Sequence, residues 1–148
     1  MNWNKDKSVV LSQVCVFAFA ICLLALDISA VPLANHLLGD MRGTAVLVGA
    51  VYAGSAFGWI CLWNLHRLLT FIRRNAVFVS ENVRAMRRVS WCCFGAAAVS
   101  FFCAVYPLPG IPFAVLGVAE AFMGLIVRIV KNAFEQAIAM KDELDLTV

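Results

Sequence analysis

Four long apolar runs, separated by short polar segments, dominate the pattern of this 148-residue chain. The runs cover residues 9–31, 44–66, 88–106 and 112–131. Each is about 20 residues long, which is the length that an α-helix needs to cross the hydrocarbon core of a bilayer. The pattern therefore predicts an all-α integral membrane protein, a four-helix bundle built as a single membrane domain over residues 1–148.

The polar segments between the runs carry turn-forming residues. Pro32, followed by Gly39 and Gly43, is expected to end the first helix and open a short outer loop. The second outer turn, residues 106–112, holds three prolines and a glycine, and Pro112 suits the first position of the fourth helix. The first run follows a basic start, as in a signal peptide, but exceeds the about 15 residues of a cleavable segment, so it is predicted to be retained.

The segment between the second and third runs is strongly basic. Residues 63–91 hold six of the twelve Lys and Arg residues, namely Arg67, Arg73, Arg74, Arg84, Arg87 and Arg88. The second helix is expected to continue to Arg74, and Ser80 is a candidate N-cap for a third helix that begins at Glu81. Residues 67–87 are thus predicted to form a basic hairpin, and residues 132–148 to form a polar helix and tail that continue the fourth helix.

The distribution of positive charge predicts the orientation. The N-terminal lead, the hairpin and the stretch after Val127 hold two, six and three Lys or Arg residues, whereas the outer loops hold only Arg42. Because positive residues stay on the cytoplasmic side, both termini are predicted to be cytoplasmic (N-in/C-in). Helices 2, 3 and 4 are then expected to extend into the cytoplasm.

Composition narrows the class of protein. The chain is 63% hydrophobic and 14% charged, so little sequence is left for a soluble domain beside four membrane helices. Its formal net charge of +3 comes from residues next to the predicted membrane boundaries. The expected partners of this charge are the lipid bilayer and its anionic headgroups, with no direct contact to nucleic acid.

One carboxylate lies well inside an apolar run. Glu120 is eight residues beyond Pro112, about 12 Å along the helix, and an ionisable group at such depth is costly unless it has a partner. Tyr52 and Ser100 lie at similar depth and are candidate hydrogen-bond partners. Two roles remain open for this intramembrane polar site: a structural, hydrogen-bonded glutamate, or a ligand or proton site.

Small residues recur at helical spacing on two of the runs. Ala50, Gly54 and Gly58 follow one another every four residues, and Gly117 and Gly124 share a face of the fourth run. Such residues let helix backbones approach closely in lipid, so packing inside the bundle is the expected role. A homodimer face at Gly54 and Gly58, and hence a homo-oligomer, is the alternative.

The remaining charged residues of the runs have simpler expected roles. Asp27 is near the outer end of the first run, where it can stay hydrated or pair with Arg42. Arg128 is near the inner face and can snorkel or pair with Glu135. With two histidines and no carboxylate cluster at matching depth, no metal site is predicted.

Six cysteines raise the question of redox chemistry. All six fall within the apolar runs and none lies in an outer loop, where four-helix thiol oxidases need exposed cysteine pairs. A buried cysteine behaves as a small apolar residue, which is the expected role here, and no cofactor is implied. A thiol cluster at the inner depth of the membrane is the alternative, with the candidates Cys15, Cys61, and Cys92 or Cys93.

Three stretches together resemble a known family: LHRLLTFIRR, VFVSENVRAMRRVSW and the tail FEQAIAMKDELDLTV. The chain is similar to the bacterial membrane family catalogued as domain of unknown function 2975, with its basic helix end, Phe-x-x-Glu-Asn turn, Arg-rich helix and acidic-Leu-Thr-Val finish. The matching residues are Phe78, Glu81, Asn82, Arg84, Arg87, Arg88, Asp145, Leu146, Thr147 and Val148. The resemblance implies four helices, no established activity, and a gene often found beside that of a small helix-turn-helix regulator of the Cro/CI type.

Two functional hypotheses follow. No nucleotide-binding loop, catalytic triad, paired catalytic carboxylates or zinc signature is present, so an enzyme is not expected. The leading hypothesis is a protein of the bacterial cytoplasmic (inner) membrane that docks or signals to a small cytoplasmic DNA-binding regulator. Its contact surface, for that partner or for lipid headgroups, would be Arg73, Arg74, Arg84, Arg87 and Arg88. The alternative is a small proton- or cation-coupled transporter or efflux subunit that uses Glu120.

Overall fold

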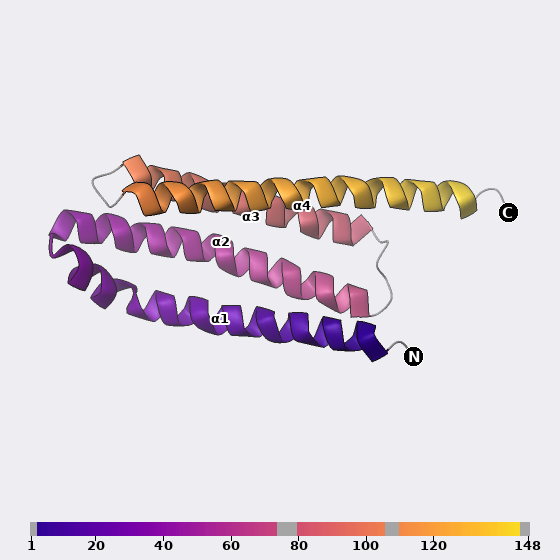
Figure 1. The fold of residues 1–148 in the computed structure, drawn as a ribbon, viewed down its shortest axis with the longest axis horizontal. Helices are drawn as coiled ribbons and strands as arrows, with labels where there is room; N and C mark the ends of the chain where they lie inside the picture. Colours follow the sequence, from indigo (N-terminus) through magenta and orange to yellow (C-terminus); the bar gives the residue numbers. More distant parts are fainter. Residues whose placement is uncertain (1–2, 74–79, 106–109, 146–148) are drawn as a thin grey trace.

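The computed structural model describes residues 3–73, 80–105 and 110–145, which form four long helices (Figure 1). They are α1 (Trp3–Leu38), α2 (Met41–Arg73), α3 (Ser80–Val105) and α4 (Gly110–Asp145). Each is long and apolar enough to cross a membrane. The predicted all-α fold with four membrane-length helices is therefore confirmed.

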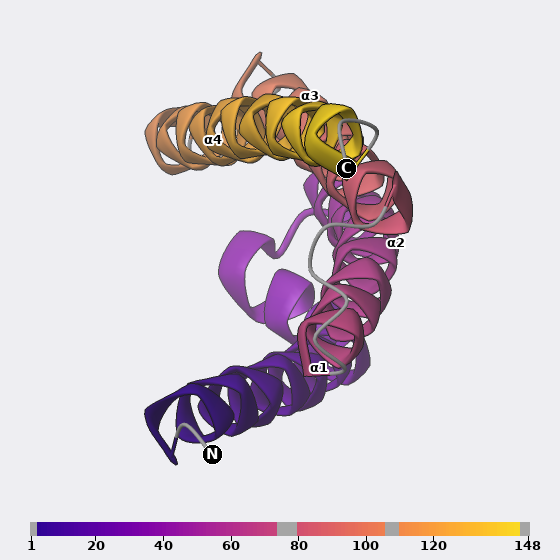
Figure 2. The ribbon, with the colours of Figure 1, turned by 90° about the vertical axis from the view of Figure 1, so that its right-hand side faces the viewer.

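The four helices form an open arc in which the first and the last do not meet. Within the described ranges each helix contacts only its neighbours in the chain, so α1 packs on α2, α2 on α3, and α3 on α4. Viewed along the helices, α1 and α4 are the two ends of the arc (Figure 2). The length of an apolar run predicts a membrane-crossing helix, but it does not predict whether the first and last helices contact each other.

The helix α3 is the most buried of the four, because α2 and α4 cover it from both sides. Small residues bring α4 close. A Cβ on Gly124 would lie 3.2 Å from the Cβ of Cys93, and the Ser90 hydroxyl donates a hydrogen bond of 2.9 Å to the Gly124 carbonyl oxygen. A Cβ on Gly117 would lie 3.2 Å from the ring of Phe101. These contacts agree with the predicted packing role of both glycines.

The first helix does not end at Pro32. This proline lies inside α1, which changes direction in its last turns and continues to Leu38 (Figure 1). A proline removes one backbone hydrogen bond, so it can kink a helix without ending it. Gly39 ends the helix instead: its φ of 61° is left-handed, and its N–H donates to the Asn35 carbonyl oxygen at 3.2 Å.

The second helix begins a few residues before the predicted start near Thr44, because Asp40 caps it. The Asp40 carboxylate accepts a hydrogen bond from the Gly43 N–H at 3.3 Å, and its carbonyl oxygen accepts one from the Thr44 N–H at 3.0 Å. An aspartate in this position satisfies backbone N–H groups that have no partner inside the helix. Asp40 lies in the segment that the sequence predicted to be an outer loop, and an aspartate just before an apolar run is a recognisable capping signal.

One end of the molecule collects the positive charge. The start of α1, the end of α2, the start of α3 and the end of α4 all lie there (Figure 1). We name it the basic end; its described arginines on α2 and α3 are Arg67, Arg73, Arg84, Arg87 and Arg88. With 36 residues each, α1 and α4 are about 54 Å long at 1.5 Å per residue, more than the ~30 Å hydrocarbon core. Helix ends therefore reach beyond the hydrocarbon.

Candidate functional site

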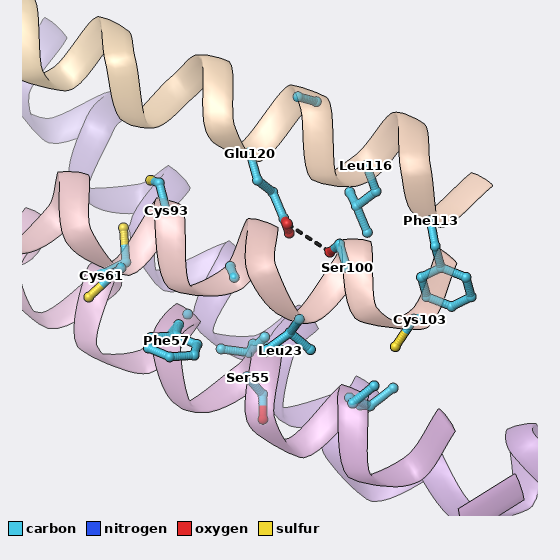
Figure 3. A pocket seen from close by; sticks show the side chains of 18 of the residues that line it. Leu23, Ser55, Phe57, Cys61, Cys93, Ser100, Cys103, Phe113, Leu116 and Glu120 are labelled. Carbon is cyan, nitrogen blue, oxygen red and sulfur yellow. Dashed lines mark hydrogen bonds between the residues drawn. The ribbon is translucent and has the colours of Figure 1, made fainter. Parts of the chain in front are cut away.

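The inner side of the arc holds a cavity of about 580 Å³, which we name the membrane groove (Figure 3). All four helices line it, for example through Leu23 of α1, Phe57 of α2, Cys103 of α3 and Leu116 of α4. Its walls are almost entirely apolar or small side chains. The groove exists because the arc leaves the facing sides of α1 and α4 apart.

The most polar contact of the groove is the one that joins Glu120 to Ser100. The Ser100 hydroxyl donates a hydrogen bond of 2.7 Å to Glu120 Oε2, and the close view shows the two side chains pointing toward each other (Figure 3). Ser100 is buried and Glu120 is half-buried. Two of the three residues predicted for an intramembrane polar site are thus brought together. Among the described residues that line the groove, none is Lys, Arg or His.

Tyr52, the third predicted member, lies elsewhere. Its hydroxyl donates to the Asp27 carbonyl oxygen at 3.2 Å, and it does not line the groove. Trp59 Nε1 donates to Asp27 Oδ2 at 3.2 Å, so Asp27 is bonded to α2 and not to Arg42. Counting residues from the helix end predicts how deep a side chain lies in the membrane. It does not predict which neighbouring helix that side chain faces.

The small-residue stripe of α2 has two different environments. A Cβ on Gly58 would lie 3.1 Å from Leu23 Cδ2, so this glycine packs against α1. A Cβ on Gly54 would have nothing within 4 Å, and both Gly54 and Ala50 line the groove. Sequence analysis missed Gly95 of α3, where a Cβ would fall 2.6 Å from the Phe57 ring, because the residues four positions away, Trp91 and Val99, are not small.

Four of the six cysteines line the groove: Cys61, Cys92, Cys93 and Cys103. All six are free thiols, and Cys15 is exposed and lies outside the groove. Across the part of the chain that the structure describes, no three His, Cys, Asp or Glu side chains gather as a metal site. The thiols therefore contribute small, weakly polar surface to the groove wall.

Ion pairs tie the helices together at the basic end. Arg67 Nη2 lies 3.0 Å from Glu81 Oε2 and joins α2 to α3, and Arg87 Nη2 lies 3.3 Å from Glu135 Oε1 and joins α3 to α4. Lys131 Nζ lies 3.0 Å from Glu135 Oε2. Glu135 therefore pairs with these two residues. Arg128, which the sequence offered as a partner of Glu135, makes no ion pair with it. The two pairs between helices are exposed to solvent, so each contributes little stability and mainly orients its side chains.

Two exposed arginines at the basic end, Arg84 and Arg88, make no ion pair with a described carboxylate. Arg84 and Arg88 border a small polar cleft of about 40 Å³ together with Asn64, Arg67 and Glu81. Within residues 3–73, 80–105 and 110–145, no ion pair includes either arginine. Of the other predicted surface residues, Arg73 is exposed and Arg87 is paired, and Arg74 lies outside the described residues. The tail residues 146–148 and Phe78 also lie outside them.

Four membrane-length helices with charge collected at one end define a multi-pass membrane protein. The chain belongs to the family described as "Protein of unknown function (DUF2975)", whose model matches residues 8–148. The resemblance seen in the basic segment and the tail is thereby confirmed, and the match extends over nearly the whole chain. No curated protein and no solved structure is detectably similar to this chain.

Proposed function

We propose that this protein is a non-enzymatic docking or signalling protein of the bacterial cytoplasmic (inner) membrane, with both termini in the cytoplasm. In this orientation the basic end faces the cytoplasm, because positive residues next to membrane helices are retained there. The partner would be a small helix-turn-helix regulator that offers an acidic surface. The protein itself would not bind nucleic acid.

The observation that carries this proposal is the state of Arg84 and Arg88. All four arginines are exposed, but Arg67 and Arg87 pair with carboxylates of this chain, whereas Arg84 and Arg88 make no ion pair within the described residues. Arg84 and Arg88 project from one face of α3. An exposed arginine pair on a helix suits an acidic protein surface or a lipid phosphate, since guanidinium groups bind carboxylates and phosphates through two parallel hydrogen bonds.

A co-purification experiment tests the docking function. The full chain, solubilised in a mild detergent, should retain the helix-turn-helix regulator encoded beside its gene, and Arg84→Glu/Arg88→Glu should abolish this retention. The matched control is Arg42→Glu, which reverses an exposed charge at the opposite end of the molecule. Equal retention by the Arg84/Arg88 variant, with membrane insertion intact, would sink the docking proposal.

A second candidate function, ion-coupled transport, is favoured by the position of Glu120 on the wall of the membrane groove. A carboxylate that borders a cavity inside the membrane can exchange a proton or cation with a transported molecule. Glu120→Gln should then abolish proton-coupled flux in vesicles that contain the protein. Full flux with this variant would exclude the carboxylate as the coupling site.

A further inference from the structure

The membrane groove places a carboxylate where its walls supply no positive charge. Glu120 lies ten residues after the start of α4, about 15 Å along the helix, so it is near the middle of the hydrocarbon core. In the described parts of the groove wall, Ser100 is the hydrogen-bond donor to Glu120, and no Lys, Arg or His is present. A carboxylate at this depth is stabilised by any cation that reaches it.

We propose that the membrane groove binds an apolar molecule that carries a single positive charge. The charge lies against the Glu120 carboxylate, and the apolar body packs on Leu23, Phe57, Phe113 and Leu116. One carboxylate among apolar walls suits one charge, because a second charge would be buried without a partner. An anion would be repelled by the carboxylate.

The size of the groove suits a small molecule. Its volume of about 580 Å³ falls within the roughly 300–1,000 Å³ of pockets that hold drug-sized ligands.

The opening of the groove provides a route for such a ligand. In the described ranges α1 does not contact α4, and the end-on view shows most of α1 and α4 apart at the two ends of the arc, with the last turns of α1 lying between them (Figure 2). Both helices are of membrane length, so this opening faces lipid. An apolar cation dissolved in the bilayer can enter sideways, without parting any packed pair of helices.

Gly54 offers a way to fill the groove without disturbing helix packing. It lines the groove, and a Cβ there would have nothing within 4 Å. Gly49, on the same helix, also has open space at its Cβ but does not line the groove. Leucine is a better helix former than glycine, so neither substitution should weaken α2. Gly54→Leu therefore occupies ligand space, and Gly49→Leu is its matched control.

Equilibrium dialysis of the full chain in phosphatidylcholine nanodiscs tests the proposal. The probe is the tetraphenylphosphonium cation, and tetraphenylborate, of the same shape but negative charge, is the control ligand; empty nanodiscs correct for partition into lipid. We expect saturable binding of the cation and none of the anion. Glu120→Gln should weaken cation binding about tenfold or more, because a charge pair is strong in a low-dielectric site.

Two pairs of variants decide the outcome. Glu120→Gln and Gly54→Leu should both weaken phosphonium binding, whereas Glu135→Gln at the basic end and Gly49→Leu should leave it unchanged. Equal binding of both probes, or wild-type affinity in Glu120→Gln, overturns the proposal. If Glu120→Gln does not fold, as judged by circular dichroism, the two glycine variants decide it. Equilibrium binding of the phosphonium cation requires neither flux nor a cytoplasmic partner. A failure of this binding proposal is therefore distinguishable from a failure of either proposed function.

Discussion

At the scale of single residues, the contact between Ser100 and Glu120 decides how α3 and α4 accommodate a carboxylate in apolar surroundings. The hydroxyl is buried, and its 2.7 Å hydrogen bond ends on a group that would otherwise have no donor from the described part of the groove. Such a bond is stronger in a medium of low dielectric constant than in water. It also holds the carboxylate toward the groove and away from lipid.

Ser100→Ala should therefore destabilise the protein. Removal of the donor leaves the carboxylate unsatisfied, which costs about 1–3 kcal/mol in the free energy of unfolding. Thermal unfolding in detergent, followed by circular dichroism, measures the change. Ser29→Ala is the control, because the Ser29 hydroxyl donates to the Ala25 carbonyl oxygen of its own helix at 2.7 Å and joins no second helix. Equal loss of stability in both variants would contradict a special role for Ser100.

At the scale of helices, glycines with similar sequence contexts serve different purposes. Gly124 lets α4 rest on α3, with a virtual Cβ 3.2 Å from Cys93 Cβ and 3.3 Å from the Ser90 carbonyl oxygen. Gly58 does the same between α2 and α1, whereas Gly54 forms open groove wall. Close approach is the source of packing energy between helices in lipid, so only the contacting glycines are expected to be sensitive to substitution.

Gly124→Ala should lower the free energy of unfolding by about 1–2 kcal/mol, since a methyl group placed against fixed backbone and Cβ atoms forces the helices apart. Gly49→Ala should leave it unchanged or raise it by up to about 1 kcal/mol, because alanine is the better helix former and the added methyl group meets open space. Denaturation in detergent of the two single variants provides the comparison. A neutral Gly124→Ala would show that α3 and α4 are less tightly packed than these distances indicate.

At the scale of the whole molecule, the positive charge is concentrated at one end of the long axis, the basic end. The start of α1 and the end of α4 both lie at the basic end, and the turn between α1 and α2 lies at the opposite end of the long axis (Figure 1). In a membrane that the four helices cross, the start of α1 and the end of α4 therefore lie on the same side. The positive residues favour the cytoplasm for that side.

Reporter fusions test the predicted orientation. Green fluorescent protein should fluoresce when fused to either terminus, and alkaline phosphatase should be inactive there, because the first folds in the cytoplasm and the second outside it. A phosphatase inserted at Gly39 should be active. Active phosphatase at a terminus would refute cytoplasmic termini and, with them, docking of a cytoplasmic regulator at the basic end.

Much of the architecture was predictable from the order of residues. Four apolar runs of bilayer length predicted the four helices, and Ser100 was found as a partner of Glu120 because depth along a helix follows from counting residues. The α1 end was mistaken because Pro32 can kink a helix or end it, and only the surrounding turns decide which. Tyr52 was predicted to bond Glu120 but bonds Asp27 instead. The sequence could not show this, because the rotation of α2 relative to its neighbours depends on contacts between residues far apart in the chain.

The sequence by itself determined that the described residues form four helices long enough to cross a membrane, and which end of the molecule carries the positive charge. These properties depend on local hydropathy and on the cost of burying charge, which each segment carries wherever it lies. Only the tertiary structure decided that the helices form an open arc, that Glu120 borders a groove, and which of the described arginines pair with carboxylates. Apolar helices in lipid have no hydrophobic drive toward one another, so their arrangement follows from close packing and hydrogen bonds between particular side chains.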